Sequence, residues 1–226
     1  MAERIIELYR IPVNLPDSLL TRMVRVLSPD ERTRADRYKF EQDRRRFIAA
    51  RASMRAILGA RLGLAPERVP FRYGPHGKPA LAECRAGEPL HFNLSDSGDW
   101  AVLGLTHAGE IGVDIEALRP IPEIASIAER FFSPAEEAWL RSLPLHEQPW
   151  AFHRIWTCKE AYLKALGAGL SLDTRSFTFD FAVKPAHLMD VADAWTLIEM
   201  TPAPAYAGAV VAPGEGWEIT WREWAP

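Results

Sequence analysis

The stretch GVDIE at residues 112–116 is the part of the sequence that decides the fold. Its polar and apolar residues alternate, which is typical of a half-buried β-strand. Because alternate side chains of a strand point to the same face, Asp114 and Glu116 would project together, while Val113 and Ile115 would face the opposite side. The stretch therefore predicts a strand that presents two carboxylates on one face.

A second stretch, WTCKEAYLK at residues 156–164, predicts a helix with a chemically distinct face. Residues four apart in a helix share a face, so Glu160 and Lys164 would lie side by side. If this helix packs against the strand, the carboxylates of Asp114, Glu116 and Glu160 offer hard oxygen ligands to Mg²⁺. The lysine adds a positive charge for a phosphate. The two stretches together predict phosphoryl-group transfer.

In this order, with Glu116 and Glu160 44 residues apart (160 − 116), the two stretches resemble the signature of the 4'-phosphopantetheinyl transferases. The segment FNLSDSG at residues 92–98 resembles the family's F-N-[IL]-S-H-S-G segment, and GKP at residues 77–79 resembles a turn of the same family. The chain length and the placement of the motifs resemble the larger, monomeric, Sfp-like branch, typified by the surfactin-synthetase activator.

This resemblance implies an α+β fold of two similar α/β lobes, related by a pseudo-twofold axis, with the active site in the cleft between them. We expect the lobes at residues 1–108 and 109–226, packed as one unit, with the metal site in the second. The implied reaction transfers the 4'-phosphopantetheinyl group of coenzyme A to a serine of an apo acyl or peptidyl carrier protein. The reaction would require Mg²⁺ and release adenosine 3',5'-bisphosphate.

The residues divide into three predicted roles. Asp114, Glu116 and Glu160 are predicted to hold the metal ion. Glu160 is also the candidate general base for the carrier serine, and Lys164 is predicted to bind the phosphate that leaves. Whether Glu160 serves as ligand, as base or as both is left open by the sequence.

Four residues are predicted to bind coenzyme A, and they are Arg46, Lys78, Ser95 and Lys164. Guanidinium and ammonium groups suit the phosphates of coenzyme A, and Lys78 lies in the GKP turn. Ser95 has an alternative role, the stabilisation of its own turn. The sequence departs from the family at Asp96, where the family commonly has histidine, because an aspartate repels phosphates. Asp96 is expected to point away, to contact a donor group of the ligand or to pair with an arginine.

Composition excludes several other classes of protein. The chain has 226 residues, of which 48% are hydrophobic, and its formal net charge of −3 argues against a nucleic-acid binder. Its two cysteines, Cys84 and Cys158, form neither a disulfide framework nor a zinc pattern, which favours a reducing cytoplasm. No signal-type segment and no run of 18 apolar residues is present, so we expect no association with a membrane.

The rest of the sequence predicts alternating helices and strands. Ser28 and Ser133 each precede a proline and acidic residues, which is typical of helix starts, and this repeat indicates two halves with a similar plan. The apolar pair at 131–132 is expected to lie in the core, with the apolar part of the carrier-binding surface as the alternative. The expected helices are 44–62, 124–132 and one through 155–166, and the expected strands are 90–94, 100–105, 111–116, 177–183, 195–200, 207–211 and 217–221, with a loop at 95–99.

Two other functions remain open at this point. A metal-dependent phosphodiesterase or nuclease also uses clustered carboxylates, and it would cleave coenzyme A or nucleic acid without a carrier protein. A binding module would recognise coenzyme A or carrier proteins without turnover and without a need for magnesium. The pathway of the carrier protein and the position of its docking surface are not encoded in these motifs.

Overall fold

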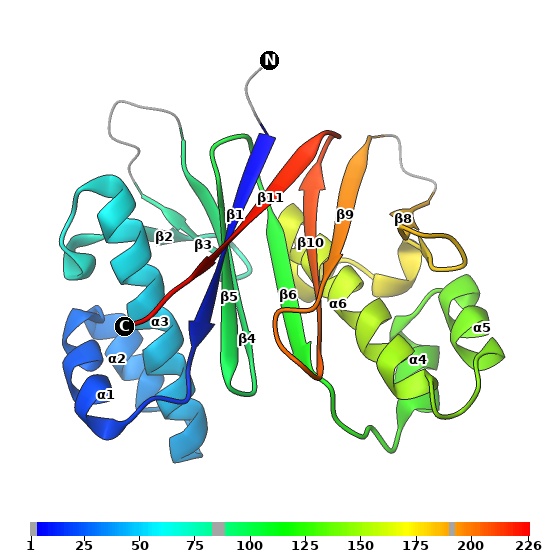
Figure 1. The fold of residues 1–226 in the computed structure, drawn as a ribbon, viewed down its shortest axis with the longest axis horizontal. Coiled ribbons are helices and arrows are strands. Elements are labelled where there is room, and N and C mark those ends of the chain that lie inside the picture. The colour runs from blue at the N-terminus through cyan, green and yellow to red at the C-terminus, as the bar shows by residue number, and fades with distance from the viewer. Residues whose placement is uncertain (1–3, 83–88, 190–192) are drawn as a thin grey trace.

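The computed structural model of this protein describes residues 4–82, 89–189 and 193–226. It confirms the expected α+β class, with two sheets at the centre and helices on both sides (Figure 1). Of the two cysteines, Cys158 is buried and free, and Cys84 lies outside the described residues. Among the described residues, none of the helices combines the length and the apolar character needed to cross a membrane.

The first sheet has four strands in the order β11-β1-β5-β4. Strand β1 pairs in parallel with β11 on one side and antiparallel with β5 on the other, and β5 and β4 form a hairpin. The bounds are β1, Arg4–Pro12; β4, His91–Ser97; β5, Trp100–Thr106; and β11, Trp217–Glu223.

The second sheet has three antiparallel strands in the order β6-β10-β9. Small two-stranded sheets, β2-β3 and β7-β8, lie outside the two main sheets. The bounds are β2, Phe71–Tyr73; β3, Pro79–Leu81; β6, Gly112–Ala117; β7, Phe179–Asp180; β8, His187–Leu188; β9, Trp195–Met200; and β10, Tyr206–Pro213.

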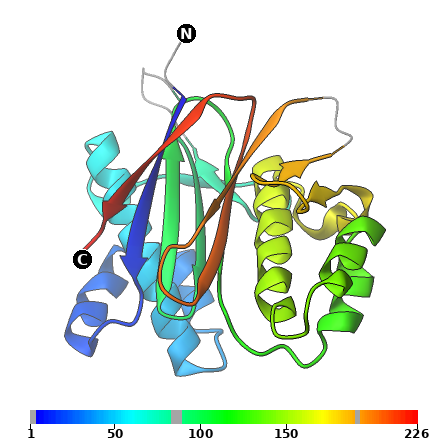
Figure 2. The ribbon, with the colours of Figure 1, turned by 45° about the vertical axis from the view of Figure 1, so that its right-hand side comes forward.

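One group of helices accompanies each sheet, so the chain forms two lobes of similar plan (Figure 1). In Figure 2 the long helix α6 stands between the second sheet and the shorter helices α4 and α5. The bounds are α1, Asp17–Met23; α2, Pro29–Ala35; α3, Glu41–Leu62; α4, Ile124–Phe131; α5, Pro134–Ser142; and α6, Gln148–Leu166, with short 3-10 helices at Val24–Val26, Pro66–Arg68, Gly169–Ser171 and Thr174–Ser176.

The helix ends follow the sequence signals. Helix α5 begins with a capping box in which the Ser133 N–H donates to Glu136 and the Glu136 N–H donates to the Ser133 hydroxyl. Helix α2 repeats the arrangement, since the Ser28 N–H donates to Glu31. Helix α3 ends at Gly63, whose φ of 64° lies in the left-handed region that favours glycine.

The core has three parts, one in each lobe and one between the two sheets. The third part joins the lobes, because side chains of β1 and β5 pack there against β6 and β10. Phe132 is fully buried in the core of the second lobe and Phe131 packs against it, which confirms the core expected for this pair. Leu166, in the last turn of α6, is 42% exposed.

The last strand departs from the expected division at residues 108 and 109. Strand β11 belongs by pairing to the first sheet, where Ile6 lies opposite Ile219 and Leu8 opposite Trp221. The chain therefore returns to its first lobe after completing the second. The reason is physical: β1 has a free edge in the first sheet, and β11 covers it with a ladder of backbone hydrogen bonds.

Candidate active site

The predicted strand and helix meet at Gly112, the first residue of β6. A Cβ atom at this position would overlap the backbone carbonyl of Ala161 in α6, so only glycine allows the strand to approach the helix so closely. Two residues further along β6, the Asp114 side chain lies beside Lys164 of α6, and Lys164 Nζ donates to Asp114 Oδ1 at 2.6 Å. The glycine of the GVDIE stretch therefore explains how the two predicted segments come together.

Asp114 and Lys164 form an ion pair at the junction of the lobes. Asp114 is only 5% exposed. Burial raises the pKa of Asp114 above its ordinary value, although the Lys164 charge and the hydroxyl of Ser95 act in the opposite direction. Burial by itself lowers the pKa of Lys164, but the Asp114 carboxylate outweighs it and the pKa of Lys164 is raised. The ammonium group is therefore a permanent positive charge in this site.

Ser95 lies in strand β4, not in the loop expected at residues 95–99, and it connects the two lobes. Its hydroxyl donates to Asp114 Oδ1 at 2.9 Å and accepts from Lys164 Nζ at 3.1 Å and from the Ile115 N–H at 3.3 Å. These contacts use its hydrogen and its lone pairs, and the side chain is buried. In this structure Ser95 holds Asp114 and Lys164 in place, whereas its predicted contact with coenzyme A stays a prediction.

The same contact repeats along β4, whose alternate side chains face the edge of β6. Asn93 Oδ1 accepts the Val113 N–H at 2.8 Å, and the Ser97 hydroxyl accepts the Ala117 N–H at 3.1 Å. Side chains, rather than backbone carbonyls, thus satisfy this edge of the second sheet. The turn after Ser97 contains Gly98, with a φ of 58°, where a Cβ would clash with the hydroxyl of Tyr206.

The other two predicted metal ligands lie within electrostatic reach of Asp114. Burial raises the pKa of Glu116, and the charge of Asp114 raises it further, while the hydrogen bond from Ser97 at 2.7 Å lowers it. Burial also raises the pKa of Glu160, and both Asp114 and Glu116 add to that shift. Such mutual repulsion among three carboxylates is relieved by a cation.

The residues fit a magnesium ion of the kind that also binds phosphates. Asp114 Oδ2 is buried and has no hydrogen-bond partner among the described residues, so one hard oxygen is left for a ligand. Within residues 4–82, 89–189 and 193–226, no three His, Cys, Asp or Glu side chains are arranged so that they could hold a metal ion together. Mg²⁺ does not need three protein ligands, because it commonly takes one or two carboxylates and completes its shell with water and substrate phosphates.

A cavity of about 350 Å³ opens between the lobes next to this cluster. Its volume lies in the range of small-molecule sites. Lys164 and Glu160 form part of its wall, and four Lys and Arg residues line it against two acidic ones, although the whole chain is acidic. The cavity therefore suits an anionic ligand. The charged lining residues are Arg34, Arg51, Lys78, Lys164, Asp96 and Glu160.

The predicted coenzyme A residues fall at different places around the cavity. Lys78 is on its wall, where its ammonium group donates to Glu110 at 2.6 Å and to the carbonyl of Ile111 at 3.1 Å. Arg46 does not line the cavity, and its guanidinium lies 3.6 Å from Asp99. The structure thus brings Lys78 and Lys164 together on the cavity wall and leaves Arg46 beside it.

Asp96, which replaces the family's histidine, faces the cavity and does not point away from it. The Asp96 side chain is exposed to solvent, yet the protein around it displaces enough water to raise the pKa of this carboxyl, and the positive charges of Lys164 and Arg46 act against this shift. It makes no ion pair with any of the described residues. Among the three expected outcomes for Asp96, a contact with a donor group of the ligand is therefore the one that this placement supports.

The sequence interpretation missed Arg34 and Arg51, two basic residues on the cavity wall. A signal was present nonetheless, because Arg51 and Arg55 interrupt an otherwise apolar face of a helix at a spacing of four. Buried arginines need a carboxylate partner, which Glu31 provides.

A second cavity, of about 470 Å³, lies on the side of Glu116. Its walls are mostly apolar, and their polar members are Glu116, Arg119, Glu123 and His153. The three carboxylates are thus placed between two cavities, with Glu160 on the wall of the basic one and Glu116 on the wall of the apolar one. Its apolar side chains are Ile121, Ile127, Phe152 and Trp156.

Comparison with known proteins agrees with this architecture. The model for the N-terminal part of 4'-phosphopantetheinyl transferases matches residues 16–107, and the model for the 4'-phosphopantetheinyl transferase superfamily matches residues 110–208. The border between the two matches falls at the border between the first sheet's hairpin and β6.

Individual relatives carry the same name. The chain is 41% identical over 215 residues to the 4'-phosphopantetheinyl transferase HetI of Nostoc sp., covering 94% of this chain and 90% of the relative. It is 36% identical to psf-1 of Bacillus pumilus, covering 73% and 70%, and 31% identical to Sfp of Bacillus subtilis, covering 70% and 67%. The chain therefore belongs to the 4'-phosphopantetheinyl transferase superfamily, in its Sfp-like type, and is an enzyme of that class.

Proposed function

We propose that this enzyme transfers the 4'-phosphopantetheinyl group from coenzyme A, bound in the basic cavity, to a serine hydroxyl of an acyl or peptidyl carrier protein, and releases adenosine 3',5'-bisphosphate. The observation that carries this proposal is a basic cavity whose wall includes Glu160 and also Lys164, the ion-pair partner of the buried Asp114. The basic walls suit the phosphates of the donor, and the carboxylates lie where its reacting diphosphate would end.

Asp114, Glu116 and Glu160 are the residues that would hold Mg²⁺. When bound, Mg²⁺ would neutralise the negative charge that builds on the leaving phosphate. The Oδ2 atom of Asp114, which has no partner among the described residues, supports this assignment, as does the raised pKa of Glu116 and of Glu160, which burial causes and the neighbouring carboxylates increase. Lys164, held by Asp114 and Ser95, would keep its ammonium group directed at the same phosphate.

Glu160 is the candidate for removing the proton of the carrier serine. Its pKa is raised by burial and by the neighbouring carboxylates, which brings a carboxylate closer to the basicity that proton transfer requires. The apolar cavity beside Glu116 is where we propose that the carrier protein approaches, because Glu116 lines it while Glu160 and Lys164 line the basic cavity that would hold coenzyme A. The serine would then reach the diphosphate from the side away from the nucleotide.

The test is the intact mass of an apo carrier protein after incubation with the enzyme, coenzyme A and Mg²⁺. A mass gain of one phosphopantetheinyl group, absent in EDTA and strongly slowed with Glu160→Gln, is the expected result. Cleavage of coenzyme A without a carrier protein would instead identify a phosphodiesterase. Magnesium-independent binding of coenzyme A, with no product from several carrier types, would identify a binding module.

The stability of the metal-free protein should depend on Glu160 in a direction fixed by its pKa. A carboxyl whose pKa is raised above 4.5 by folding is protonated more fully in the folded state, so its contribution to the free energy of unfolding decreases as the pH rises through 4.5 towards neutral. The difference in that free energy between wild type and Glu160→Gln should therefore shift against the wild type over this range.

Urea unfolding in EDTA at several pH values measures this difference. Glu218→Gln, a change on the exposed strand β11, controls for the loss of a carboxyl group elsewhere. Adding Mg²⁺ should stabilise the wild type more at pH 7.5 than at pH 5, because the metal binds only the deprotonated carboxylates. A difference that is constant with pH would contradict the raised pKa of Glu160 in the folded protein.

We also propose that the enzyme is a cytoplasmic monomer. Both walls of the basic cavity come from this one chain, Arg51 from the first lobe and Lys164 from the second, so a second copy is not needed to complete the site. Sedimentation velocity at micromolar concentration tests the monomer, and a dimer mass would contradict it. A buried free Cys158 agrees with a reducing compartment.

A further inference from the structure

Each lobe contains the same small device, a helix cap whose glutamate also binds a basic residue of the next long helix. In the first lobe Glu31 accepts the Ser28 N–H at 3.0 Å, and in the second Glu136 accepts the Ser133 N–H at 2.8 Å. Both glutamates are almost fully buried, at 2% and 1% exposure. Because Glu31 and Glu136 hold the same position in their helices, a comparison of their basic partners shows the role of each glutamate in its lobe.

In the second lobe the basic partner of the glutamate makes all its hydrogen bonds inside the lobe. Lys159 of α6 donates to both carboxylate oxygens of Glu136, at 2.9 and 2.6 Å, and its third bond goes to the carbonyl of Phe177 at 2.9 Å. The Phe179 N–H donates to the same glutamate. Lys159 is 3% exposed, and its three donor positions are all used inside the lobe. This pair holds α5, α6 and the following chain together and touches neither cavity.

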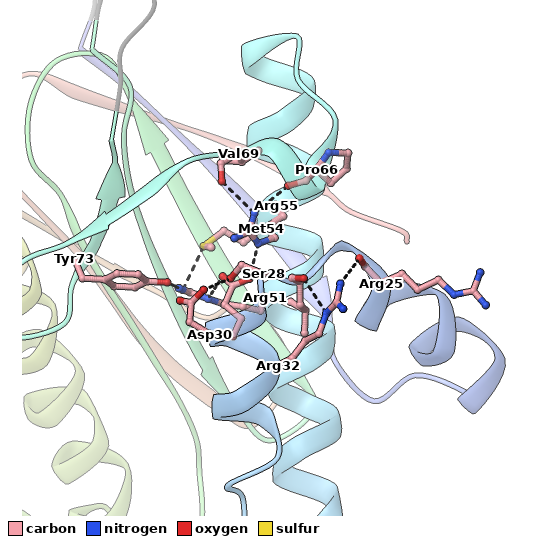
Figure 3. A network of polar contacts seen from close by, with 12 residues as sticks. Arg25, Ser28, Asp30, Arg32, Arg51, Met54, Arg55, Pro66, Val69 and Tyr73 are labelled. Atoms are coloured by element: carbon pink, nitrogen blue, oxygen red, sulfur yellow. Dashed lines mark hydrogen bonds and ion pairs between the residues drawn. The ribbon is translucent and has the colours of Figure 1, made fainter.

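In the first lobe the glutamate binds two arginines of α3. Arg55 makes all its hydrogen bonds inside the lobe, whereas Arg51 also lines the basic cavity. Arg55 donates to Glu31 Oε2 at 2.6 Å and to the carbonyls of Pro66 and Val69, both at 3.1 Å. Arg55 thus corresponds to Lys159 of the second lobe, which also makes its hydrogen bonds only inside its lobe. Arg51 donates to Glu31 Oε1 at 3.0 Å, one turn earlier on the same helix, and its side chain lines the basic cavity. Figure 3 shows both guanidinium groups in this network.

The guanidinium of Arg51 keeps donor capacity for a ligand. It has five N–H groups. One nitrogen donates to Glu31, a second to the hydroxyl of Tyr73 at 2.9 Å, and the third only approaches the sulfur of Met54 at 3.8 Å, a weak acceptor (Figure 3). The ring of Phe71 lies under the group, 5.6 Å from its central carbon. The planar guanidinium group of Arg51, called the fork below, is therefore fixed in direction, while some of its N–H groups have no strong acceptor among the described residues.

We propose that Glu31 is a positioning residue that holds the fork of Arg51 against an anionic group of the donor in the basic cavity, with the hydroxyl of Tyr73 fixing its second side. This rests on the proposed function, since it assigns how that donor is held. A long arginine side chain loses much rotational freedom when it binds an anion, and a preformed fork has already lost it before binding. Glu136 has no such role in the second lobe, because its partner Lys159 lines neither the basic nor the apolar cavity.

The experiment compares Glu31→Gln with Glu136→Gln, the same change at the same cap position in the other lobe. Calorimetry gives the Kd of coenzyme A for each protein. Loss of the Glu31 charge alone would make the cavity more positive and would tighten binding of an anion. Positioning predicts the opposite sign, a Kd raised about 3- to 10-fold by the ordering cost of one side chain, with KM raised and kcat nearly unchanged. Glu136→Gln should lose comparable stability and keep the Kd.

Two further variants secure the result. In an Arg51→Gln background, Glu31→Gln should add no further weakening, because its effect acts through that arginine. Tyr73→Phe changes a residue that is 44% exposed and tests the same fork if Glu31→Gln does not fold. It should raise the Kd by a smaller factor.

The outcomes separate this proposal from the proposed function. An unchanged or lower Kd for Glu31→Gln, equal effects of the two glutamate variants, or full additivity with Arg51→Gln would overturn the positioning role. So would an unchanged Kd for Tyr73→Phe in the case where Glu31→Gln does not fold. A wild type that binds coenzyme A but transfers nothing would overturn the transfer reaction and leave the Kd comparison decisive. A wild type that does not bind coenzyme A would overturn both.

Discussion

Asp114→Asn should lower the kcat/KM of phosphopantetheinyl transfer by more than about 100-fold, since the loss of a partner one step removed from a metal already costs about 10- to 100-fold. Asp114 supplies a buried oxygen without a partner among the described residues and also holds Lys164. Asparagine keeps the shape of the side chain but removes the charge that both functions need. The variant should lose stability because Lys164 loses its carboxylate partner, but it should remain folded, since the Lys164 side chain is partly exposed to solvent and keeps its hydrogen bond to Ser95.

The matched control is Glu199→Gln on strand β9. Glu199 and Asp114 lie opposite Ala209 on the two neighbouring strands, so the three residues form one row across the second sheet. Each carboxylate accepts a hydrogen bond from a basic residue of α6. For Glu199 this residue is Arg154, at 2.7 Å, and neither of the two lines the basic cavity. The control should retain most of its transfer activity. Equal losses in the two variants would mean that the sheet tolerates no amide in this row and would remove Asp114 from the chemistry.

The sequence was sufficient wherever a local pattern encodes a contact between near neighbours. In β6, Val113 and Ile115 face the core between the sheets, as the alternation predicts, and Asp114 contacts Lys164 of α6. Glu160 and Lys164, four residues apart in α6, lie on the wall of the same cavity. The helix caps at Ser28 and Ser133 were readable for the same reason, because both partners of a capping box lie within one turn.

The features that could not be predicted all depend on contacts between distant segments. Strand β11 pairs with β1 across more than 200 residues, and no local pattern in either strand names its partner. Ser95 was placed in a loop because serine, aspartate and glycine are common there, yet the edge of β6 draws it into a strand. Arg51 reaches the cavity only because Glu31 and Tyr73 direct it there.

The second large effect is expected for Glu160→Gln, which should lower kcat by about 10²- to 10⁴-fold, the usual contribution of a general base. Glutamine keeps an oxygen for the metal and the shape of the side chain, but it cannot accept the proton of the carrier serine. The Kd of coenzyme A should change little, because the phosphates are bound by the basic wall. Single-turnover kinetics with an apo carrier protein separates the chemical step from binding.

Glu116→Gln is the comparison that distinguishes the base from a metal ligand. Glu116 accepts a hydrogen bond from Ser97 at 2.7 Å and lies on the wall of the apolar cavity, whereas Glu160 lies on the wall of the basic one, with no hydrogen bond from another side chain of the described residues. If Glu160 is the base, its variant should stay slow at saturating Mg²⁺, while Glu116→Gln should recover as Mg²⁺ increases, since only its metal affinity is reduced. Recovery of both variants at high Mg²⁺ would make Glu160 a metal ligand alone and would leave the proton of the serine to another acceptor.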